Sequence, residues 1–515
     1  MKPACIRRGT AALCMLLCAA LLAGCAPQST SASSTGTGVP AAQSAAGDSG
    51  QFVLPYSSAE GFNPYTSKSN ITLQDSRLLF SNFVDITNDY ELVYNVASAV
   101  VSTGNEVSIT VGGSFADGTA ITGADAAASL EAARASSVFG ARFANVSAVR
   151  AAGNTVTVTL QKPDSLFAYL LDIPVMKAGE TASASPTSSG RYSVSSTADG
   201  VALTANASFA GKTPFDTIQL AELSGYDALV SSLNLGVISL FSSEQESDLA
   251  GSIVCNTSYF NLNNLVFLGI QPESPDSPLN QSALRQAISL GISRRQIADK
   301  AYYSRAYVAT GVINPRFPGE SAAATLAEET DTAKAKALIE SLGYTMDEAS
   351  GFYQSADGKR LSFSLLCYTG SSFKKYAASL VADELSRIGI EVTVSEDSDF
   401  TSYSEKISSG TAPLYIGEVK LYNNMDMDAF FGTGNARVRV TPSDALLAAY
   451  DAMKADKTAL AGFETAFAAE MPFVPLVYKN GVATYSKDFS GLTPTVSDIF
   501  YGFENLTIDN ATQKE

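Results

Sequence analysis

The segment 361–394 constrains the fold more than any other part of this 515-residue chain. Leu361–Leu366 has the composition of a strand, Tyr376–Ile388 carries apolar residues at helical spacing, and Ile390–Val394 is a second strand-like run. A strand, a helix and a strand in succession favour a parallel pair with a right-handed connection. The chain is therefore predicted to contain an α/β sheet, and Leu414–Val419 is expected to be a further strand of that sheet.

The first 51 residues have the organisation of an exported, anchored chain. A positive start is followed by an apolar run that ends in Leu22-Ala23-Gly24-Cys25, which is similar to the bacterial lipobox. We therefore expect a signal peptide over 1–24, a lipidated Cys25 and a flexible linker rich in Ser, Thr, Gly, Ala and Pro over 25–51. The predicted location is the outer side of the cell membrane, held by the lipid anchor only; an ordinary signal peptide that is cleaved nearby is the alternative.

The composition limits what the remaining 460 or so residues can do. They are too many for one core, which suggests two or three lobes. The net charge of −17 argues against nucleic acid and anionic lipid as partners. The chain has no histidine, so it cannot assemble a Ser-His-Asp relay, and a transition-metal site is improbable. We expect no cofactor and no metal. Cys255 and Cys367 could pair, but free thiols are slightly favoured.

Several local patterns indicate particular elements. Thr122 is a suitable helix N-cap, with Asp125 in the first turn of the helix that follows. The two runs 190–194 and 201–205 are predicted to form a hairpin, and Ser293 is expected to cap a second helix. The apolar run Leu78–Phe80 is interpreted as part of a strand.

The sequence also resembles family 5 of the extracellular solute-binding proteins, the oligopeptide-, dipeptide- and nickel-binding lipoproteins of ABC importers. Phe115–Asp125 is similar to that family's signature F-x-D-G-T-x-x-T-A-x-D, and Leu284–Ile288 with Gly291–Arg294 is similar to its R-Q-A run ending in I-D-R. Weaker similarities occur in the same order as in the family, at Asn314-Pro315 and at Pro472–Leu476. The resemblance extends from about residue 52 to about residue 503.

The resemblance implies a two-lobed, hinged α/β fold of the periplasmic-binding-protein type (class II), with an extra domain inserted into the first lobe. The expected first lobe comprises 52–70, 190–260 and 475–515, the inserted subdomain 71–189, and the second lobe 261–474. Such a protein is not an enzyme: it would bind a short peptide between its lobes and deliver it to an ABC permease. We expect a monomer.

The family's motif G-W-x-x-D-Y supplies the candidate ligand-binding residues, because its aspartate pairs with the amino group of a bound peptide. The similar stretch here is Gly417-Glu418-Val419-Lys420-Leu421-Tyr422-Asn423, in which Glu418 replaces the tryptophan and Leu421 the aspartate. Glu418, Asp426 or Asp428 could supply the missing carboxylate, or the ligand has no amino group; Lys420 would suit a ligand carboxylate. Alternatively, Glu418 and Lys420 lie on an exposed strand face. Gly417, Tyr422, Asn423 and, less directly, Tyr478 complete the predicted site.

Three other interpretations remain open at this point. The ligand could be an oligosaccharide or a metal chelate, although the chain lacks the tryptophan and the histidine that such sites often use. The chain could be a lipid-anchored protein of adhesion or sensing that has lost transport. A hydrolase that uses a carboxylate pair such as Asp426 and Asp428 is the least favoured of the three.

Overall fold

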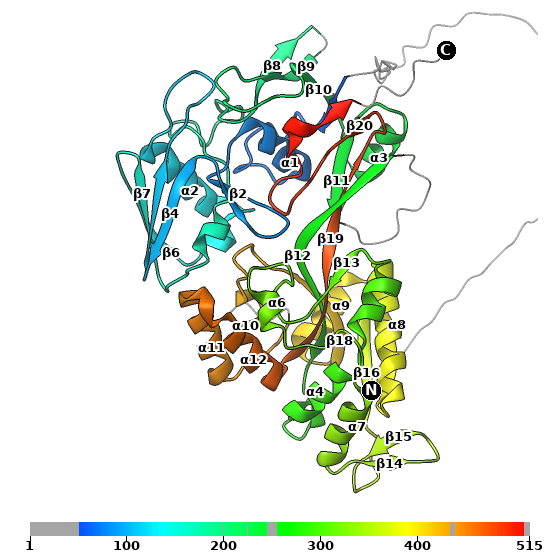
Figure 1. Ribbon diagram of the computed structural model, residues 1–515. Helices are drawn as coiled ribbons and strands as arrows, with labels where there is room; N and C mark the ends of the chain where they lie inside the picture. Colours follow the sequence, from blue (N-terminus) through cyan, green and yellow to red (C-terminus); the bar gives the residue numbers. More distant parts are fainter. Residues whose placement is uncertain (1–50, 199, 224, 245–254, 433–437, 509–515) are drawn as a thin grey trace, which may run out of the picture. The chain divides into compact units, whose positions relative to one another are not determined.

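The computed structural model describes residues 51–198, 200–223, 225–244, 255–432 and 438–508, which belong to one compact unit (Figure 1). The predicted signal peptide, the lipidated Cys25 and the linker up to residue 50 lie outside the described residues. Within the described ranges, no helix has the length and apolar character that crossing a bilayer requires.

The largest sheet has seven strands, six of them in the order β11-β19-β12-β18-β16-β17, with β13 pairing on β19. Strands β16 and β17 are parallel, as are β16 and β18, so the predicted crossover and its third strand are confirmed. Helix α8 joins β16 to β17. The strands are β11 (Leu240–Glu244), β12 (Asn256–Ile270), β13 (Ala306–Val308), β16 (Ser362–Tyr368), β17 (Glu391–Asp397), β18 (Leu414–Lys420) and β19 (Phe473–Tyr485), and α8 is Ser372–Arg387.

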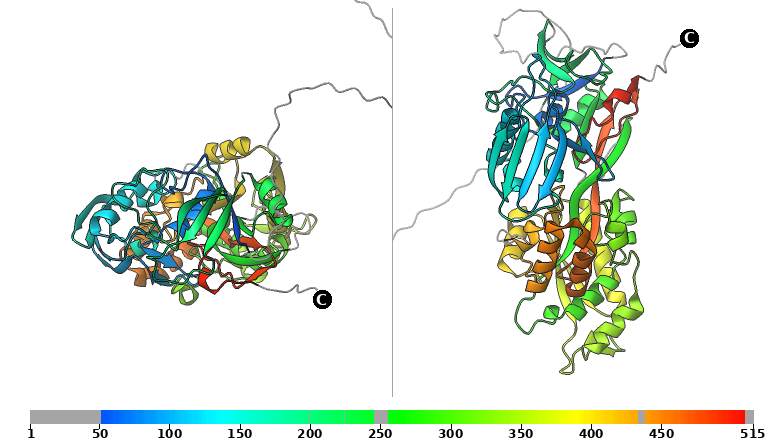
Figure 2. Two further views of the ribbon diagram at one scale, coloured as in Figure 1. Left: turned by 90° about the horizontal axis from the view of Figure 1, so that it is seen from above. Right: turned by 60° about the vertical axis from the view of Figure 1, so that its left-hand side comes forward.

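Strands β12 and β19 are the longest elements of this sheet and run side by side in antiparallel pairing (Figures 1 and 2). Their register shifts between Asn261 and Leu265. The expected lobe boundaries at 260/261 and 474/475 fall inside β12 and β19 respectively, so both strands would belong to both lobes. The division into lobes at these residues stays a prediction.

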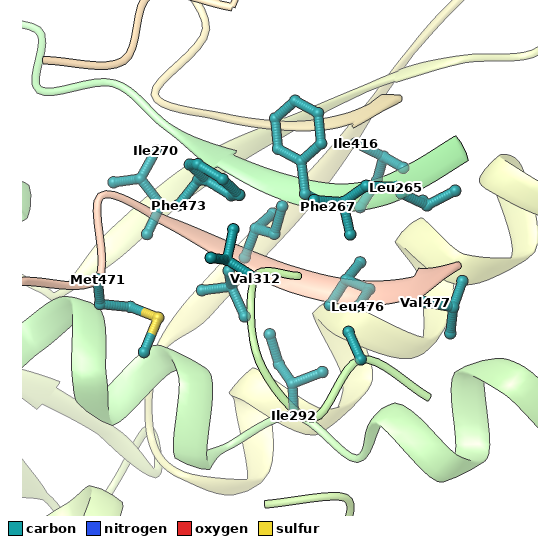
Figure 3. Close-up of a cluster of buried hydrophobic side chains, with 14 of the residues drawn as sticks. Leu265, Phe267, Ile270, Ile292, Val312, Ile416, Met471, Phe473, Leu476 and Val477 are labelled. Carbon is teal, nitrogen blue, oxygen red and sulfur yellow. The ribbon is translucent and has the colours of Figure 1, made fainter. Parts of the chain in front are cut away.

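A large apolar core packs against this sheet (Figure 3). Leu265 and Phe267 of β12 meet Phe473 and Leu476 of β19, and Ile292 closes the cluster from the short loop between residues 290 and 294. Burying one such side chain contributes about 1.5–3 kcal/mol, so the sheet and its helices are held together mainly by this core. The helices of this half are α4 (Ser282–Leu290), α5 (Arg294–Gln296), η4 (Ile297–Ala301), α6 (Glu320–Ala323), α7 (Thr332–Ser341), α9 (Phe400–Ser409), α10 (Asp428–Phe431), α11 (Asp444–Ala455) and α12 (Leu460–Glu470).

Two four-stranded sheets surround a second core. One has the order β1-β10-β9-β8 and includes the predicted hairpin, which is confirmed; the other has the order β4-β5-β7-β6. The strands are β1 (Val53–Tyr56), β4 (Ala97–Thr103), β5 (Glu106–Val111), β6 (Val146–Ala152), β7 (Thr155–Leu160), β8 (Tyr192–Thr197), β9 (Gly200–Ala205) and β10 (Thr217–Glu222). The helices are α1 (Asn70–Leu79), α2 (Gly123–Ala135), α3 (Tyr226–Asn234), η1 (Gly140–Phe143) and η2 (Phe167–Leu170).

The remaining elements are short. Pairs of strands form at β2 (Val84–Ile86) with β3 (Leu92–Tyr94), β14 (Thr345–Asp347) with β15 (Phe352–Gln354), and β20 (Phe489–Ser490) with β21 (Thr507–Ile508). Short 3-10 turns occur at η3 (Pro278–Asn280), η6 (Lys457–Ala459) and η7 (Phe503–Asn505).

The predicted caps are confirmed. The Asp125 carboxylate accepts a hydrogen bond from the backbone N–H of Thr122 at 2.9 Å, and Ser293 Oγ accepts one from Gln296 N at 3.1 Å. The strand interpretation of Leu78–Phe80 was wrong, because Leu78 and Leu79 form the last turn of α1 and only Phe80 is extended. A run of three apolar residues fits the buried face of a helix as well as it fits a strand. Cys255 and Cys367 are both free.

Candidate functional site

The candidate residues Gly417, Glu418 and Lys420 lie at the C-terminal end of β18, beside the C-terminal end of the parallel strand β16. In α/β sheets this edge is where ligands most often bind. Gly417 is buried against the ring of Phe267, and a Cβ at this position would collide with that ring. Glu418 and Lys420 are two residues apart and therefore share a face of the strand.

Glu418 is held in a buried cluster of charges. Its Oε1 lies 3.1 Å from Lys479 Nζ and its Oε2 2.5 Å from Lys374 Nζ; the exposed fractions of the three side chains are 12% for Glu418, 2% for Lys479 and 16% for Lys374. Burial would raise the pKa of Glu418, but the two lysine charges and a hydrogen bond from Asn264 outweigh burial and lower the pKa to about 2. The carboxylate is therefore ionised and already neutralised, and we call these residues the Glu418 cluster.

Asn264 connects this cluster to a second, exposed ion pair. Its Nδ2 donates to Glu418 Oε1 at 2.7 Å and to Glu244 Oε2 at 3.1 Å. Glu244 Oε1 is ion-paired with Lys420, whose side chain is 59% exposed. An exposed pair of this kind contributes only about 0–1 kcal/mol, so a ligand group can displace either partner at small cost.

Glu244 lines two adjacent cavities, which we call the Glu244 cavities. The smaller has a volume of about 240 Å³ and the larger about 560 Å³, and the larger lies in the range of about 300–1,000 Å³ that is usual for small-molecule sites. Arg77 and Lys420 line the smaller cavity and Tyr226 lines the larger. Both cavities are lined by Asn70, Gln74, Ser242 and Ser243. The Glu244 cavities therefore combine two carboxyl groups, those of Glu244 and Asp498, with two cations and several neutral polar groups.

The turn after β18 makes a buried polar bridge. Asn423 Nδ2 donates to Asp172 Oδ2 at 3.0 Å, while Asn423 Oδ1 accepts from Asn263 Nδ2 at 2.7 Å. Asp172 also forms an ion pair with Arg142 at 2.7 Å. Tyr422 is half-buried beside these groups, and burial raises the pKa of its hydroxyl. The turn thus connects the seven-stranded sheet to the segment 142–172.

Tyr478 lies apart from the other candidates. It is fully buried in the core, and its hydroxyl donates to Val312 O at 2.6 Å. In this structure its side chain contacts protein on all sides, and a role in ligand contact stays a prediction. The neighbouring Lys479, on the opposite face of β19, reaches Glu418 instead.

Sequence reasoning missed Lys374, Lys479, Asn264 and Glu244. Lys479 had a visible signal, because a single charged residue directly follows the apolar run Phe473–Tyr478. The other three lie in segments far apart along the chain, on α8, β12 and β11, and only the packing of that helix and the pairing of the strands bring them to Glu418 and Lys420. Glu418 and Lys420 do share a face, but the face is not uniformly exposed: Lys420 is exposed and Glu418 is not.

The other acidic candidates lie beyond the turn. Asp426 is 3.6 Å from Lys454, which is itself 2.9 Å from Asp164. Burial, followed by the charge of Asp426, raises the pKa of Asp428. Within the described ranges, no group of three or more His, Cys, Asp or Glu side chains is placed to hold a metal ion.

The structure is a mixed α/β fold whose candidate site lies at the ends of parallel strands, where ligands of such sheets most often bind. Residues 107–437 match the model of the bacterial extracellular solute-binding proteins, family 5, and the chain belongs to this family. Its fold is accordingly the two-lobed, periplasmic-binding-protein-like fold of that family.

Solved structures with the same fold bind different ligands. The nickel ABC transporter protein of Bacillus halodurans has a TM-score of 0.70 at 18% identity, covering 87% of this chain and 97% of that chain. The oligopeptide-binding protein AppA of Bacillus subtilis, in complex with a nonapeptide, has a TM-score of 0.57 at 17% identity, covering 90% and 99%. NikA of Brucella suis, in complex with Fe(III)-EDTA, has a TM-score of 0.64 at 16% identity, covering 88% and 99%.

One relative with a known function matches only a short part of this chain. The nickel-binding periplasmic protein of Escherichia coli is 23% identical over 130 residues, which are 25% of this chain and 24% of the relative. The match therefore spans about a quarter of that protein's length, and it does not identify the ligand of this chain.

Proposed function

We propose that this chain, the substrate-binding protein of an ABC importer, captures short peptides in the Glu244 cavities and delivers them to a membrane permease. The observation that carries the proposal is the combination of charges in these cavities: Glu244, Arg77 and Lys420 all line the smaller one. A short peptide carries an ammonium group at one end and a carboxylate at the other. Glu244 would bind the ammonium group and the two cations the carboxylate.

This assignment moves the amine-binding role from Glu418 to Glu244. Both oxygens of Glu418 already face lysine ammonium groups, so a third cation there would be repelled. Glu244 is exposed, and its pair with Lys420 can be exchanged for a ligand ammonium. The lipid anchor at Cys25 belongs to the same proposal, because a tether keeps the loaded protein near its permease.

The ligand class can be tested directly by mass spectrometry of small molecules released when the purified full chain is denatured. Short peptides are expected. Recovery of only oligosaccharides or of a metal chelate would overturn the peptide assignment. If the purified chain releases no small molecule and also binds no member of a peptide library, the transport role would be overturned.

The roles within the cavity are tested by the Glu244→Gln variant, which removes the charge and keeps the shape. Loss of one exchangeable ion contact is expected to weaken peptide binding about 10-fold, with a smaller effect on peptides whose amino group is acetylated. The matched control is Glu396→Gln, which removes an equally exposed carboxylate paired with Lys375. Equal affinities for Glu244→Gln and the unaltered chain in isothermal titration would contradict the assigned role.

A further inference from the structure

The two Glu244 cavities differ in the charges that line them. Among the described residues, Glu244 is the only charged side chain at the larger cavity of about 560 Å³. The smaller cavity, of about 240 Å³, is lined by Arg77 and Lys420 as well as by Glu244 and Asp498. A ligand carboxylate therefore finds a cation at the smaller cavity, whereas the larger cavity offers a single carboxylate that suits an ammonium group.

Asp498 does not cancel this difference. Burial and the charge of Asp85 raise the pKa of Asp498 to about 7, so this carboxyl group is partly protonated at neutral pH. Arg77 and Lys420 then share the smaller cavity with the carboxylate of Glu244 and with a partly neutral carboxyl group. Positive charge is therefore in excess among the residues that line the smaller cavity.

The larger cavity has an apolar wall where α3 packs beside β11 (Figure 1). Tyr226 and Leu229 of α3 and Phe241 of β11 form this wall, and the rings of Tyr226 and Phe241 lie edge to face with their centroids 6.0 Å apart. Tyr226 is still 47% exposed, and Leu229 is half-buried. An apolar ligand group that covers this wall removes apolar surface from water, which favours binding.

The two cavities adjoin along α1 and β11. Gln74 and Ser242 line both cavities, and Gln74 Nε2 donates a hydrogen bond to Ser242 Oγ at 2.6 Å. Asn70, one helical turn before Gln74, also lines both. The carboxamide groups of Asn70 and Gln74 can donate and accept hydrogen bonds, which suits the C=O and N–H of a peptide bond. A peptide bond at this junction would place one ligand residue in each cavity.

We propose that the site binds a dipeptide in one direction, with a large apolar first side chain in the larger cavity and a small second residue in the smaller cavity. The ammonium group then lies at Glu244, and the carboxylate lies at Arg77 and Lys420. This inference rests on the proposed function and adds to it the length of the peptide, its direction and the class of its first side chain.

The test is isothermal titration of the purified full chain with the dipeptides Phe-Ala and Ala-Phe, which have the same composition and the same charged ends. Ala-Ala provides the baseline. Phe-Ala is expected to bind about 10-fold tighter than Ala-Phe, and also tighter than Ala-Ala. Equal affinities, tighter binding of Ala-Phe, or binding of longer peptides only would overturn the inference while the proposed function stands. Binding of no peptide at all would overturn the proposed function, and the inference with it.

Two variants locate the first side chain of the ligand. Tyr226→Ser removes an exposed part of the apolar wall, and Leu229→Trp fills part of the larger cavity. Each is expected to weaken the binding of Phe-Ala about 10-fold and that of Ala-Ala less than about 2-fold, because only the larger side chain needs the wall and the space. The first variant changes an exposed residue, so the test stays valid if Leu229→Trp does not fold.

Tyr376→Ser is the matched control, because Tyr376 is 44% exposed on α8 and lines neither cavity. It should leave the affinities for Phe-Ala and Ala-Ala unchanged. The inference would be overturned if the affinity for Phe-Ala survived both cavity variants, fell equally for Ala-Ala, or was lost in the control.

Discussion

At the scale of single residues, the Glu418 cluster shows how one substitution in a family motif changes a site. A carboxylate at a buried position needs compensation, and two lysines from α8 and β19 supply it. The compensation makes Glu418 a structural charge, whereas the Glu244–Lys420 pair is exposed and is where we propose ligand contact. Under the proposed function, the amine-binding carboxylate would therefore lie outside the stretch that is similar to the family's motif.

The first prediction concerns that cluster. Glu418→Gln removes the buried carboxylate that the ammonium groups of Lys374 and Lys479 both contact, and we expect the free energy of unfolding at pH 7 to fall by about 3–5 kcal/mol. The pKa of Glu418 in the folded state is lowered below its unfolded value, so the stabilisation is present above about pH 4.5 and is lost as the pH falls toward 2. Urea unfolding of both chains at pH 7 and at pH 3 should therefore show a difference that shrinks at the lower pH.

Lys420→Gln is the matched control for this measurement, because its ion pair with Glu244 is exposed. We expect it to change the free energy of unfolding by less than about 1 kcal/mol. A Glu418→Gln variant as stable as this control would show that the cluster contributes nothing to folding.

At the scale of elements, the cap of α2 joins two segments of the second core. The Asp125 carboxylate accepts from Thr122 N at 2.9 Å and, through its other oxygen, from Ala178 N at 2.9 Å. One side chain thus begins the helix and fixes the segment that packs beside it. The signature stretch Phe115–Asp125 therefore has a structural reason to end in an acidic residue.

The second prediction follows from these two hydrogen bonds. Asp125→Ala leaves two backbone N–H groups without their acceptor, and we expect a loss of about 2 kcal/mol in the free energy of unfolding. Asp125→Asn keeps an oxygen that can accept one of the bonds and should lose less than half as much. Thermal unfolding followed by circular dichroism would measure both. An equal loss in the two variants would mean that the charge, rather than the acceptor geometry, stabilises the cap.

The elements that the sequence predicted correctly are those whose determining residues are close together in the chain. The crossover at 361–394, the α2 cap and the hairpin of β8 and β9 were predictable, because the residues that determine each of them are close together in the chain. The α1 end at Leu78–Leu79 was misread because so short an apolar run has no period. The Glu418 cluster was out of reach, since Lys374, Glu418 and Lys479 meet only through the pairing of separate strands and a helix.

At the scale of the whole molecule, buried polar contacts join the segment 142–172 to the seven-stranded sheet. Asn423 and Asp172 form one such contact, and Asn424 Nδ2 donates to Asp164 at 2.8 Å in another. Tyr169 also packs against Phe317. Contacts of this kind favour the closed state of a hinged protein and would set how much binding energy a ligand must supply.

The third prediction tests this role. Asp172→Ala removes the acceptor of Asn423 and the partner of Arg142, and we expect the ligand-free chain to become more open. Small-angle scattering should then give a larger radius of gyration without ligand and a value near that of the unaltered chain when the ligand is saturating.

Asp451→Ala provides the matched control, since Asp451 pairs with Lys162 through an exposed contact at 3.2 Å. It should leave the radius of gyration unchanged. If Asp172→Ala and the control give the same scattering curve at every ligand concentration, the hydrogen bond between Asn423 and Asp172 does not favour the closed state.

Asn264 links the buried Glu418 cluster to the exposed Glu244–Lys420 pair, and only the exposed pair is accessible to dissolved salt. Mobile ions shield charges that are exposed to solvent over roughly 8–10 Å at moderate ionic strength, but they do not penetrate a buried cluster. Salt should therefore loosen the Lys420–Glu244 pair while leaving Glu418 and its lysines in place. The structure around Glu418 would therefore be the same at low and at high salinity. Only the affinity of the site for charged nutrients would change with the salt concentration.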